Sequence, residues 1–176
     1  MTRIGLLADS HGREETTRRA VELLVAEGAD VLLHLGDIAS TGVLESLVAA
    51  RDARGAPAPP VHVVFGNVDD VDRLGREALR LGLPVDHPAG RLRLAGKTVA
   101  FLHGHLARDF EAALADGVEY LCHGHTHERR DERQGPSRRT RVINPGALHR
   151  AREHTVAILD VAADRVRFLG VPREEL

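Results

Sequence analysis

Three histidines, His123, His125 and His127, occur within five residues and follow a short apolar strand, Tyr120–Cys122. Alternate residues of a strand face the same side, so the side chains of His125 and His127 can converge on one point. Two converging imidazoles are typical of a transition-metal site. On this stretch alone, a solvent-exposed histidine-rich turn is an equally good interpretation.

Four other apolar runs of the chain also end in a polar residue that can bind a metal. The runs are residues 4–8, 31–35, 61–65 and 98–102, and the polar residues are Asp9 with His11, then Asp37, Asn67 and His103. In open α/β sheets the ligand site lies outside the carboxyl ends of the strands. We therefore expect these side chains to meet at one place.

The residue types restrict the metal. Imidazole, carboxylate and amide oxygen together suit Mn, Fe, Zn, Ni or Co and argue against a calcium or thiolate site. Seven candidate ligands are too many for one tetrahedral ion, but they fit two ions about 3.5–4 Å apart that share a carboxylate. Such a pair lowers the pKa of a bridging water and stabilises charge on phosphoryl oxygens.

The remaining pattern predicts the scaffold. Amphipathic stretches predict helices over 13–27, 41–53, 71–81 and 106–115, and strands are expected over 91–94, 138–143, 155–161 and 165–169. This order predicts an α/β (α+β) fold in which two packed sheets are flanked by helices, in a single domain covering residues 1–176.

Composition excludes several classes of protein. Apolar residues make up 43% and charged residues 28%, as in an ordinary globular domain, and the net charge of −2 gives no nucleic-acid signal. The single cysteine, Cys122, excludes an internal disulfide, and no apolar run is long enough to span a membrane. No signal peptide precedes Asp9 and His11, so we expect a cytoplasmic protein.

Short motifs in this order resemble the calcineurin-like metallophosphoesterases, most closely the small single-domain phosphodiesterases of bacteria and archaea. The chain is also similar to the retromer subunit of that fold. The motifs are Asp9-Ser10-His11, Gly36-Asp37, Gly66-Asn67-Val68-Asp69, His103-Gly104-His105, Gly124-His125-Thr126-His127 and Asn144-Pro145-Gly146. The resemblance implies a four-layer αββα sandwich with two divalent metal ions.

The resemblance also assigns roles. The first ion would be held by Asp9, His11 and His127, and the second by Asn67, His103 and His125, with Asp37 bridging both. The residues expected to act in catalysis are Asp37, Asn67, His103 and His105. Asn144-Pro145-Gly146 would shape a loop beside the site, although a simple turn explains it equally well.

One position departs from the family pattern. Many relatives carry a histidine directly after the motif asparagine to protonate the leaving oxygen, and Val68 stands there in this chain. A missing general acid typically costs about 10²–10⁴ in rate. We therefore expect slow turnover or good leaving groups, with Asp69, Asp70 or His105 as substitute donors.

Three functions remain open. The leading prediction is a dinuclear phosphodiesterase, with Mn²⁺ the most expected ion, in which a metal-bridging hydroxide attacks a small phosphate diester. The alternatives are a phosphomonoesterase and a non-catalytic, protein-binding scaffold of the same fold. A homo-oligomer is compatible with each of them, and no membrane partner is expected.

Several other polar residues receive a structural interpretation. His123 and His34 are expected to be packed or hydrogen-bonded, Cys122 to be a buried thiol, and Ser10 and Thr126 to hydrogen-bond beneath the ligands. His62, His87, His149 and His154 have no matching partners in the sequence. An arginine-rich run, residues 129–141, is either a solvated hairpin or a clamp for an anionic substrate.

Overall fold

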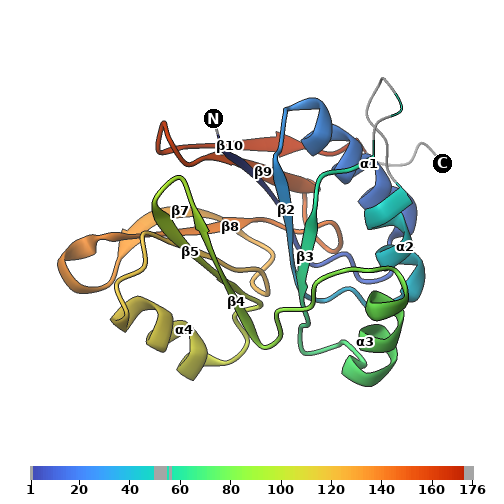
Figure 1. The fold of residues 1–176 in the computed structure, drawn as a ribbon, viewed down its shortest axis with the longest axis horizontal. Helices are drawn as coiled ribbons and strands as arrows, with labels where there is room; N and C mark the ends of the chain where they lie inside the picture. The colour runs from blue at the N-terminus through green and yellow to red at the C-terminus, as the bar shows by residue number, and fades with distance from the viewer. Residues whose placement is uncertain (1, 50–54, 56, 173–176) are drawn as a thin grey trace.

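The fold consists of ten strands and four helices in the part of the chain that the computed structural model describes, residues 2–49, 55 and 57–172 (Figure 1). In chain order they are β1 (Arg3–Leu7), α1 (Glu14–Ala26), β2 (Val31–Leu35), α2 (Thr41–Ala49), β3 (Val61–Val64), α3 (Val71–Arg80), β4 (Ala89–Leu94), β5 (Lys97–Leu102), α4 (Ala107–Ala115), β6 (Tyr120–Cys122), β7 (Arg129–Gln134), β8 (Thr140–Pro145), β9 (Thr155–Asp160) and β10 (Arg165–Gly170). A short turn at Pro136–Arg138 joins β7 to β8. No helix among these residues is long and apolar enough to cross a membrane.

The strands form two five-stranded sheets. The first has the order β10-β9-β1-β2-β3, in which β1, β2 and β3 are parallel and β9 is antiparallel to β1. The second has the order β4-β5-β6-β8-β7, with a parallel centre of β5, β6 and β8 and an antiparallel strand at each edge. Parallel strands place their carboxyl ends at one edge of a sheet, which is where the predicted ligands follow.

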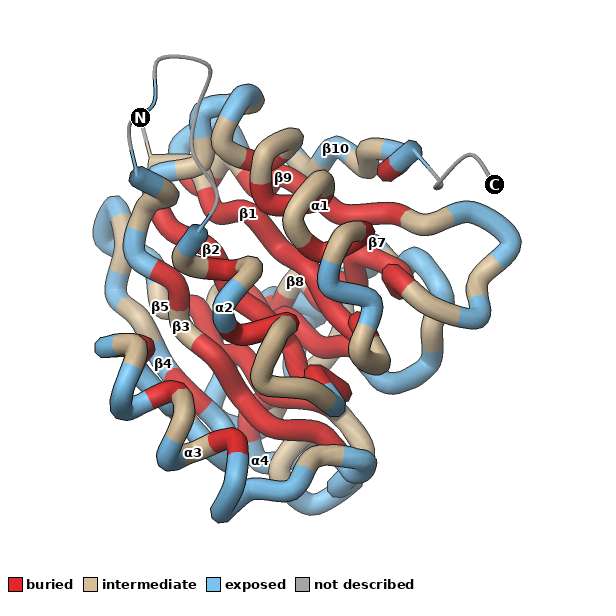
Figure 2. The backbone as a smooth tube through the Cα atoms, turned by 90° about the vertical axis from the view of Figure 1, so that its right-hand side faces the viewer, coloured by how far each residue is buried: buried red, intermediate tan, exposed pale blue. Residues whose placement is uncertain are grey.

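Apolar side chains fill three layers of core. One cluster packs α1, α2 and α3 on the outer face of the first sheet, through residues such as Leu24, Leu44 and Leu74. A second cluster, which includes Leu33 and Phe101, lies between the sheets, and a third packs α4 on the second sheet. The central strands are accordingly buried along their length (Figure 2). The structure confirms the predicted αββα sandwich.

Local sequence explains the element boundaries. Ser40 accepts a hydrogen bond from the backbone N–H of Val43 at the start of α2, and Asp70 accepts one from Arg73 at the start of α3. The predicted helices 13–27, 71–81 and 106–115 are each confirmed to within a residue at either end. The predicted end of the second helix at Ala53 lies outside the described residues.

Strand β7 is the main element that the sequence left undecided. Its residues are almost entirely charged, so neither face shows the apolar alternation of a strand. It forms because it is an edge strand whose backbone pairs with β8 over six residues, from Arg129 opposite Pro145 to Gln134 opposite Thr140. The solvated-hairpin interpretation of the arginine run is therefore the correct one for most of its length.

Two glycines give a direct test of this packing. A Cβ on Gly75, inside α3, would meet no atom within 4 Å, so Gly75→Ala should raise the free energy of unfolding by about 0.5–1 kcal/mol. A Cβ on Gly66 would lie 2.0 Å from Oδ1 of Asp37, so Gly66→Ala should lower the free energy of unfolding by about 1–3 kcal/mol. Urea unfolding in a chelator measures both, and a destabilised Gly75→Ala protein would contradict the helix packing.

Candidate metal centre

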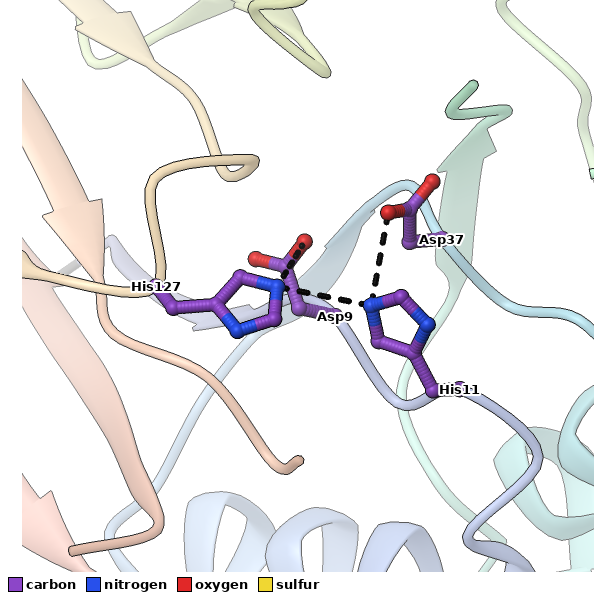
Figure 3. A group of neighbouring side chains, drawn as sticks. All are labelled: Asp9, His11, Asp37 and His127. Atoms are coloured by element: carbon purple, nitrogen blue, oxygen red, sulfur yellow. Dashed lines mark hydrogen bonds and ion pairs between the residues drawn. The ribbon is translucent and has the colours of Figure 1, made fainter. Parts of the chain in front are cut away.

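Four of the predicted ligands meet where β1, β2 and the loop after β6 come together (Figure 3). The Nε2 atom of His11 lies 3.4 Å from Oδ2 of Asp37 and 3.4 Å from Nε2 of His127. The Nε2 atom of His127 lies 3.4 Å from Oδ1 of Asp9. The four ligand atoms all lie within 4.8 Å of one another, a spacing that a single cation can serve.

The other three predicted ligands form a second half of the cluster, in which His103 reaches the second oxygen of Asp37 and contacts both Asn67 and His125. Oδ1 of Asp37 lies 3.3 Å from Nε2 of His103, and that same nitrogen lies 3.1 Å from Oδ1 of Asn67. The ring of His125 contacts the ring of His103 edge-on, with centroids 5.0 Å apart. The structure thus brings all seven predicted residues into one cluster, with Asp37 between its two halves.

The hydrogen bond between Nδ1 of His103 and the backbone carbonyl of Leu35 determines which ring nitrogen carries the proton when the ring is neutral. Nδ1 of His103 donates to the backbone carbonyl of Leu35 at 2.8 Å, so in the neutral ring Nε2 carries a lone pair. That lone pair faces the carboxylate of Asp37, which is also an acceptor. A second proton on Nε2 satisfies these oxygens in the metal-free protein, and a metal ion can take the place of that proton; the backing of a ligand histidine by a carbonyl is usual in metal sites.

Burial disfavours the charged forms of the carboxylates and imidazoles in the cluster. Burial raises the pKa of Asp9 to about 7 against the opposing effect of His103, and nearby Asp37 raises the pKa further. Burial lowers the pKa of His11, His125 and His127, which keeps these imidazoles neutral near pH 7. Burial also opposes the charged forms of Asp37 and His103, but their mutual hydrogen bond lowers the pKa of Asp37 and raises that of His103. A divalent cation would stabilise both carboxylates and take the neutral imidazoles as ligands.

The backbone at the strand ends is strained in a way that points to function. The φ angle is positive at five of the seven predicted ligands, with values from 44° to 71°; these are Asp9, His11, Asp37, His125 and His127. Such conformations cost about 1 kcal/mol or more for a residue with a Cβ and cluster at functional sites. The surrounding hydrogen bonds therefore hold these side chains in directions that a relaxed chain would not give.

Asn144 holds the loop that carries His125 and His127. Its buried amide nitrogen donates to the carbonyl of Gly124 at 2.9 Å and to Oγ1 of Thr126 at 3.1 Å, and its oxygen accepts from the backbone of Gly146. The backbone N–H of His125 in turn donates to the carboxylate of Asp9. Asn144-Pro145-Gly146 is therefore a brace for the loop, which is more than the simple turn that the sequence also allowed.

Buried polar residues beneath the cluster agree with their predicted structural roles. His34 and Ser10 are fully buried and hydrogen-bond through Nε2 and Oγ at 2.8 Å, with Thr17 donating to Ser10. His123 is buried against Phe110 and hydrogen-bonds to the carbonyl of Gly124, away from the cluster. Burial raises the pKa of Cys122 to about 12, so this thiol is no nucleophile near pH 7.

The three candidate proton donors differ in what they contact. Asp69 accepts backbone N–H bonds from Ala39 and Gly66, both at 2.7 Å, and Asp70 is the N-cap of α3, so both carboxylates act as structural acceptors. His105 faces the cluster, with its ring centroid 5.3 Å from that of His103. Its Nδ1 is buried with no hydrogen-bond partner among the described residues. Val68, by contrast, is 46% exposed and contacts Asp37 only through its backbone N–H.

Two nearby groups were not predicted from the sequence. The ring of His149 packs against that of His11 with centroids 5.1 Å apart, and Nε of Arg13 lies 3.4 Å from Nδ1 of His149. The sequence shows no matching partner for His149, because its partners come from the loop after β1, far away in the chain. Of the arginine-rich run, Arg129 lies at the site, whereas Arg133 and Arg141 pair with Asp164 elsewhere.

A four-layer αββα fold with two buried carboxylates, and with imidazoles and an exposed amide beside them at its strand ends, defines a metal-dependent hydrolase of phosphate esters. The chain belongs to the calcineurin-like phosphoesterase superfamily, whose domain matches residues 2–164. It is 27% identical over 155 residues to "Phosphodiesterase YfcE" of Escherichia coli strain K12, an alignment that covers 84% of this chain and 80% of that protein.

Solved structures show the same fold. A structure described as a novel archaeal phosphodiesterase aligns with a TM-score of 0.80 at 23% identity and covers 96% of this chain and 99% of its own. The structure of the Escherichia coli phosphoesterase YfcE aligns with a TM-score of 0.66 at 20% identity, over 97% of this chain and 100% of its own. These similarities agree with the two-sheet architecture described above.

Acid titration tests the buried support under the cluster. Burial lowers the pKa of His34 to about 3, while the unfolded chain binds a proton near the ordinary value of 6.5. Between these values the unfolded state holds more protons, so His34 should lower the free energy of unfolding by up to about 1.4 kcal/mol per pH unit on acidification. Urea unfolding of metal-free protein from pH 7 to pH 4.5 should give a shallower slope for His34→Gln. The exposed His87, changed to Gln, is the control, and identical slopes in all three proteins would contradict the assignment.

Proposed function

We propose that this protein is a dinuclear metal-dependent phosphodiesterase. One observation carries the proposal: a ligand atom from each of four side chains, Asp9, His11, Asp37 and His127, lies within 4.8 Å of the other three. Acceptor atoms that converge in this way are the usual arrangement of ligands around a cation. Membership of the phosphoesterase superfamily supports a phosphate ester as the substrate.

The two oxygens of Asp37 support a shared, bridging role for this carboxylate. Oδ2 faces His11 at 3.4 Å, whereas Oδ1 faces His103 at 3.3 Å, so each oxygen belongs to a different half of the cluster. We assign Asp9, His11 and His127 to one ion and Asn67, His103 and His125 to the other. The donor set suits Mn²⁺ first, and Fe, Ni, Zn or Co as alternatives.

The residues of the chain then have separate tasks. A bound pair of divalent ions supplies a water of lowered pKa and stabilises charge on the phosphoryl oxygens. Asn67 and His103 fix the second half of the cluster, and Asp37 fixes the distance between the halves. His105, whose ring centroid lies 5.3 Å from that of His103, is proposed to contact an oxygen of the substrate.

A phosphate diester with a good leaving group fits this site better than a monoester. The apolar, half-exposed side chain of Val68 occupies the place where many relatives have a proton-donating histidine, and Asp69 and Asp70 are engaged with backbone amides. A leaving group that needs no proton is then favoured. The complete set of seven ligands speaks against a scaffold without catalysis. A cytoplasmic location and a homo-oligomer remain predictions.

Replacing the shared carboxylate tests the proposal. Asp37→Asn should lower kcat/KM for bis(p-nitrophenyl) phosphate with Mn²⁺ by at least about 100-fold, because the metal pair contributes several kcal/mol of charge stabilisation. It should also reduce the rise in melting temperature that Mn²⁺ gives the parent protein. Asp116→Asn, which changes an exposed carboxylate paired with Arg91, is the control. Equal rates for Asp37→Asn and the parent protein would refute the metal site, whereas the absence of hydrolysis of any ester by the parent protein would favour the scaffold.

Restoring an imidazole at position 68 tests the account of the leaving group. Val68→His should accelerate hydrolysis of a phenyl diester, a poor leaving group, by about 10-fold or more, since a positioned general acid contributes about 10²–10⁴ when fully effective. The gain for a p-nitrophenyl diester should be smaller. Val68→Gln is the matched variant without a proton to transfer. Parent rates on p-nitrophenyl monoester that exceed those on the diester would instead favour the phosphomonoesterase.

A further inference from the structure

A pocket of about 530 Å³ opens directly beside the candidate metal centre, and its wall begins at His127. Residues 127–129 form one side, and residues 151–153 with Thr155 form the other. A volume of this size is typical of a small-molecule site. When the phosphate of a diester lies against the metal ligands, one of its two alcohol groups can therefore occupy this pocket.

The position of Arg129 follows from the fold. Arg129 is the first residue of β7 and pairs with Pro145 at the end of β8, next to the brace formed by Asn144. Its guanidinium lies 3.8 Å from the carboxylate of Glu153 and 6.0 Å from the centroid of the Phe168 ring. These contacts hold one cation at the wall of the pocket, and Arg152 supplies a second.

Arginine side chains lie both in the wall of the pocket and close to the neighbouring metal ligands. Two more arginines, Arg13 and Arg150, act on His149, the ring that packs against His11. The wall of the pocket itself carries two guanidinium groups, Arg129 and Arg152, and two carboxylates, Glu128 and Glu153. Guanidinium groups bind phosphate and carboxylate through paired hydrogen bonds, which favours a ligand that carries such a group.

We propose that this pocket binds the alcohol half of a diester that carries a second anionic group, such as a phosphate, and that Arg129 and Arg152 determine this specificity. The inference rests on the proposed phosphodiesterase function. The scissile phosphate lies at the metal ligands, and the second anion lies beside the two guanidinium groups. A sugar phosphate or a nucleotide meets this description, whereas the alcohol of a neutral lipid does not.

Two chromogenic diesters that differ by one phosphate test the proposal. The p-nitrophenyl ester of thymidine 5′-phosphate is compared with the same ester bearing a 3′-phosphate. For the parent protein with Mn²⁺, the additional phosphate should lower KM by about 10-fold, the effect of one charge-assisted contact. In Arg129→Gln/Arg152→Gln the ratio of the two KM values should fall to about one. Arg76→Gln/Arg139→Gln removes the same charge from exposed arginines elsewhere and should keep the parent ratio.

Binding without turnover separates the two proposals. Titration calorimetry of Mn²⁺-loaded protein should show tighter binding of thymidine 3′,5′-bisphosphate than of thymidine 5′-phosphate, and this difference should vanish in Arg129→Gln/Arg152→Gln. Hydrolysis of both esters with equal KM values would overturn the pocket and leave the phosphodiesterase intact. Absence of any hydrolysis would overturn the phosphodiesterase, and calorimetry would then still decide whether the pocket binds the second phosphate. A difference that persists in Arg129→Gln/Arg152→Gln would place the anion elsewhere and also overturn the pocket.

Discussion

The crowding of carboxylates and imidazoles into a small, largely buried space is the constraint on which the candidate site depends. His103 donates its Nδ1 proton to Leu35, and Asp37 lies between Nε2 of His103 on one side and Nε2 of His11 on the other. Burial raises the pKa of Asp9 to about 7, which measures how poorly this environment tolerates an unpaired charge. Such an arrangement is stable when positive charge lies within it, and a phosphate ester brings further negative charge to the same place.

The fold brings the carboxyl-terminal ends of strands from both sheets to one point. The first sheet contributes Asp9, His11, Asp37 and Asn67, and the second contributes His103, His125 and His127. Positive φ angles at five of these positions turn the side chains inward. Asn144 and the pair of Ser10 and His34 supply hydrogen bonds that hold the turned segments. Apolar packing between the sheets supplies the rigidity that those bonds need.

Much of this arrangement could be predicted from the sequence. Apolar runs that end in Asp, Asn or His identify the strands and their polar tips, because burial and the carboxyl-end rule act locally. The contact between Arg13 and His149 could not be predicted, since it depends on how two loops 136 residues apart in the chain approach each other. Strand β7 was not predicted for a related reason. Backbone pairing with β8 makes it a strand, and its own side chains show no strand pattern.

Because ligands come from both sheets, the thickness of the apolar layer between the sheets affects the distances between ligands of the first sheet and ligands of the second. Phe101 and Cys122 from one sheet and Leu35 and Val64 from the other lie in that layer, and all are fully buried. Adding or removing a methylene there changes the gap between the sheets, with no change to any ligand. On the proposed function, the choice among ions of different radius therefore depends partly on apolar side chains that coordinate nothing; Leu35 and Phe101 stand two residues before the ligands Asp37 and His103.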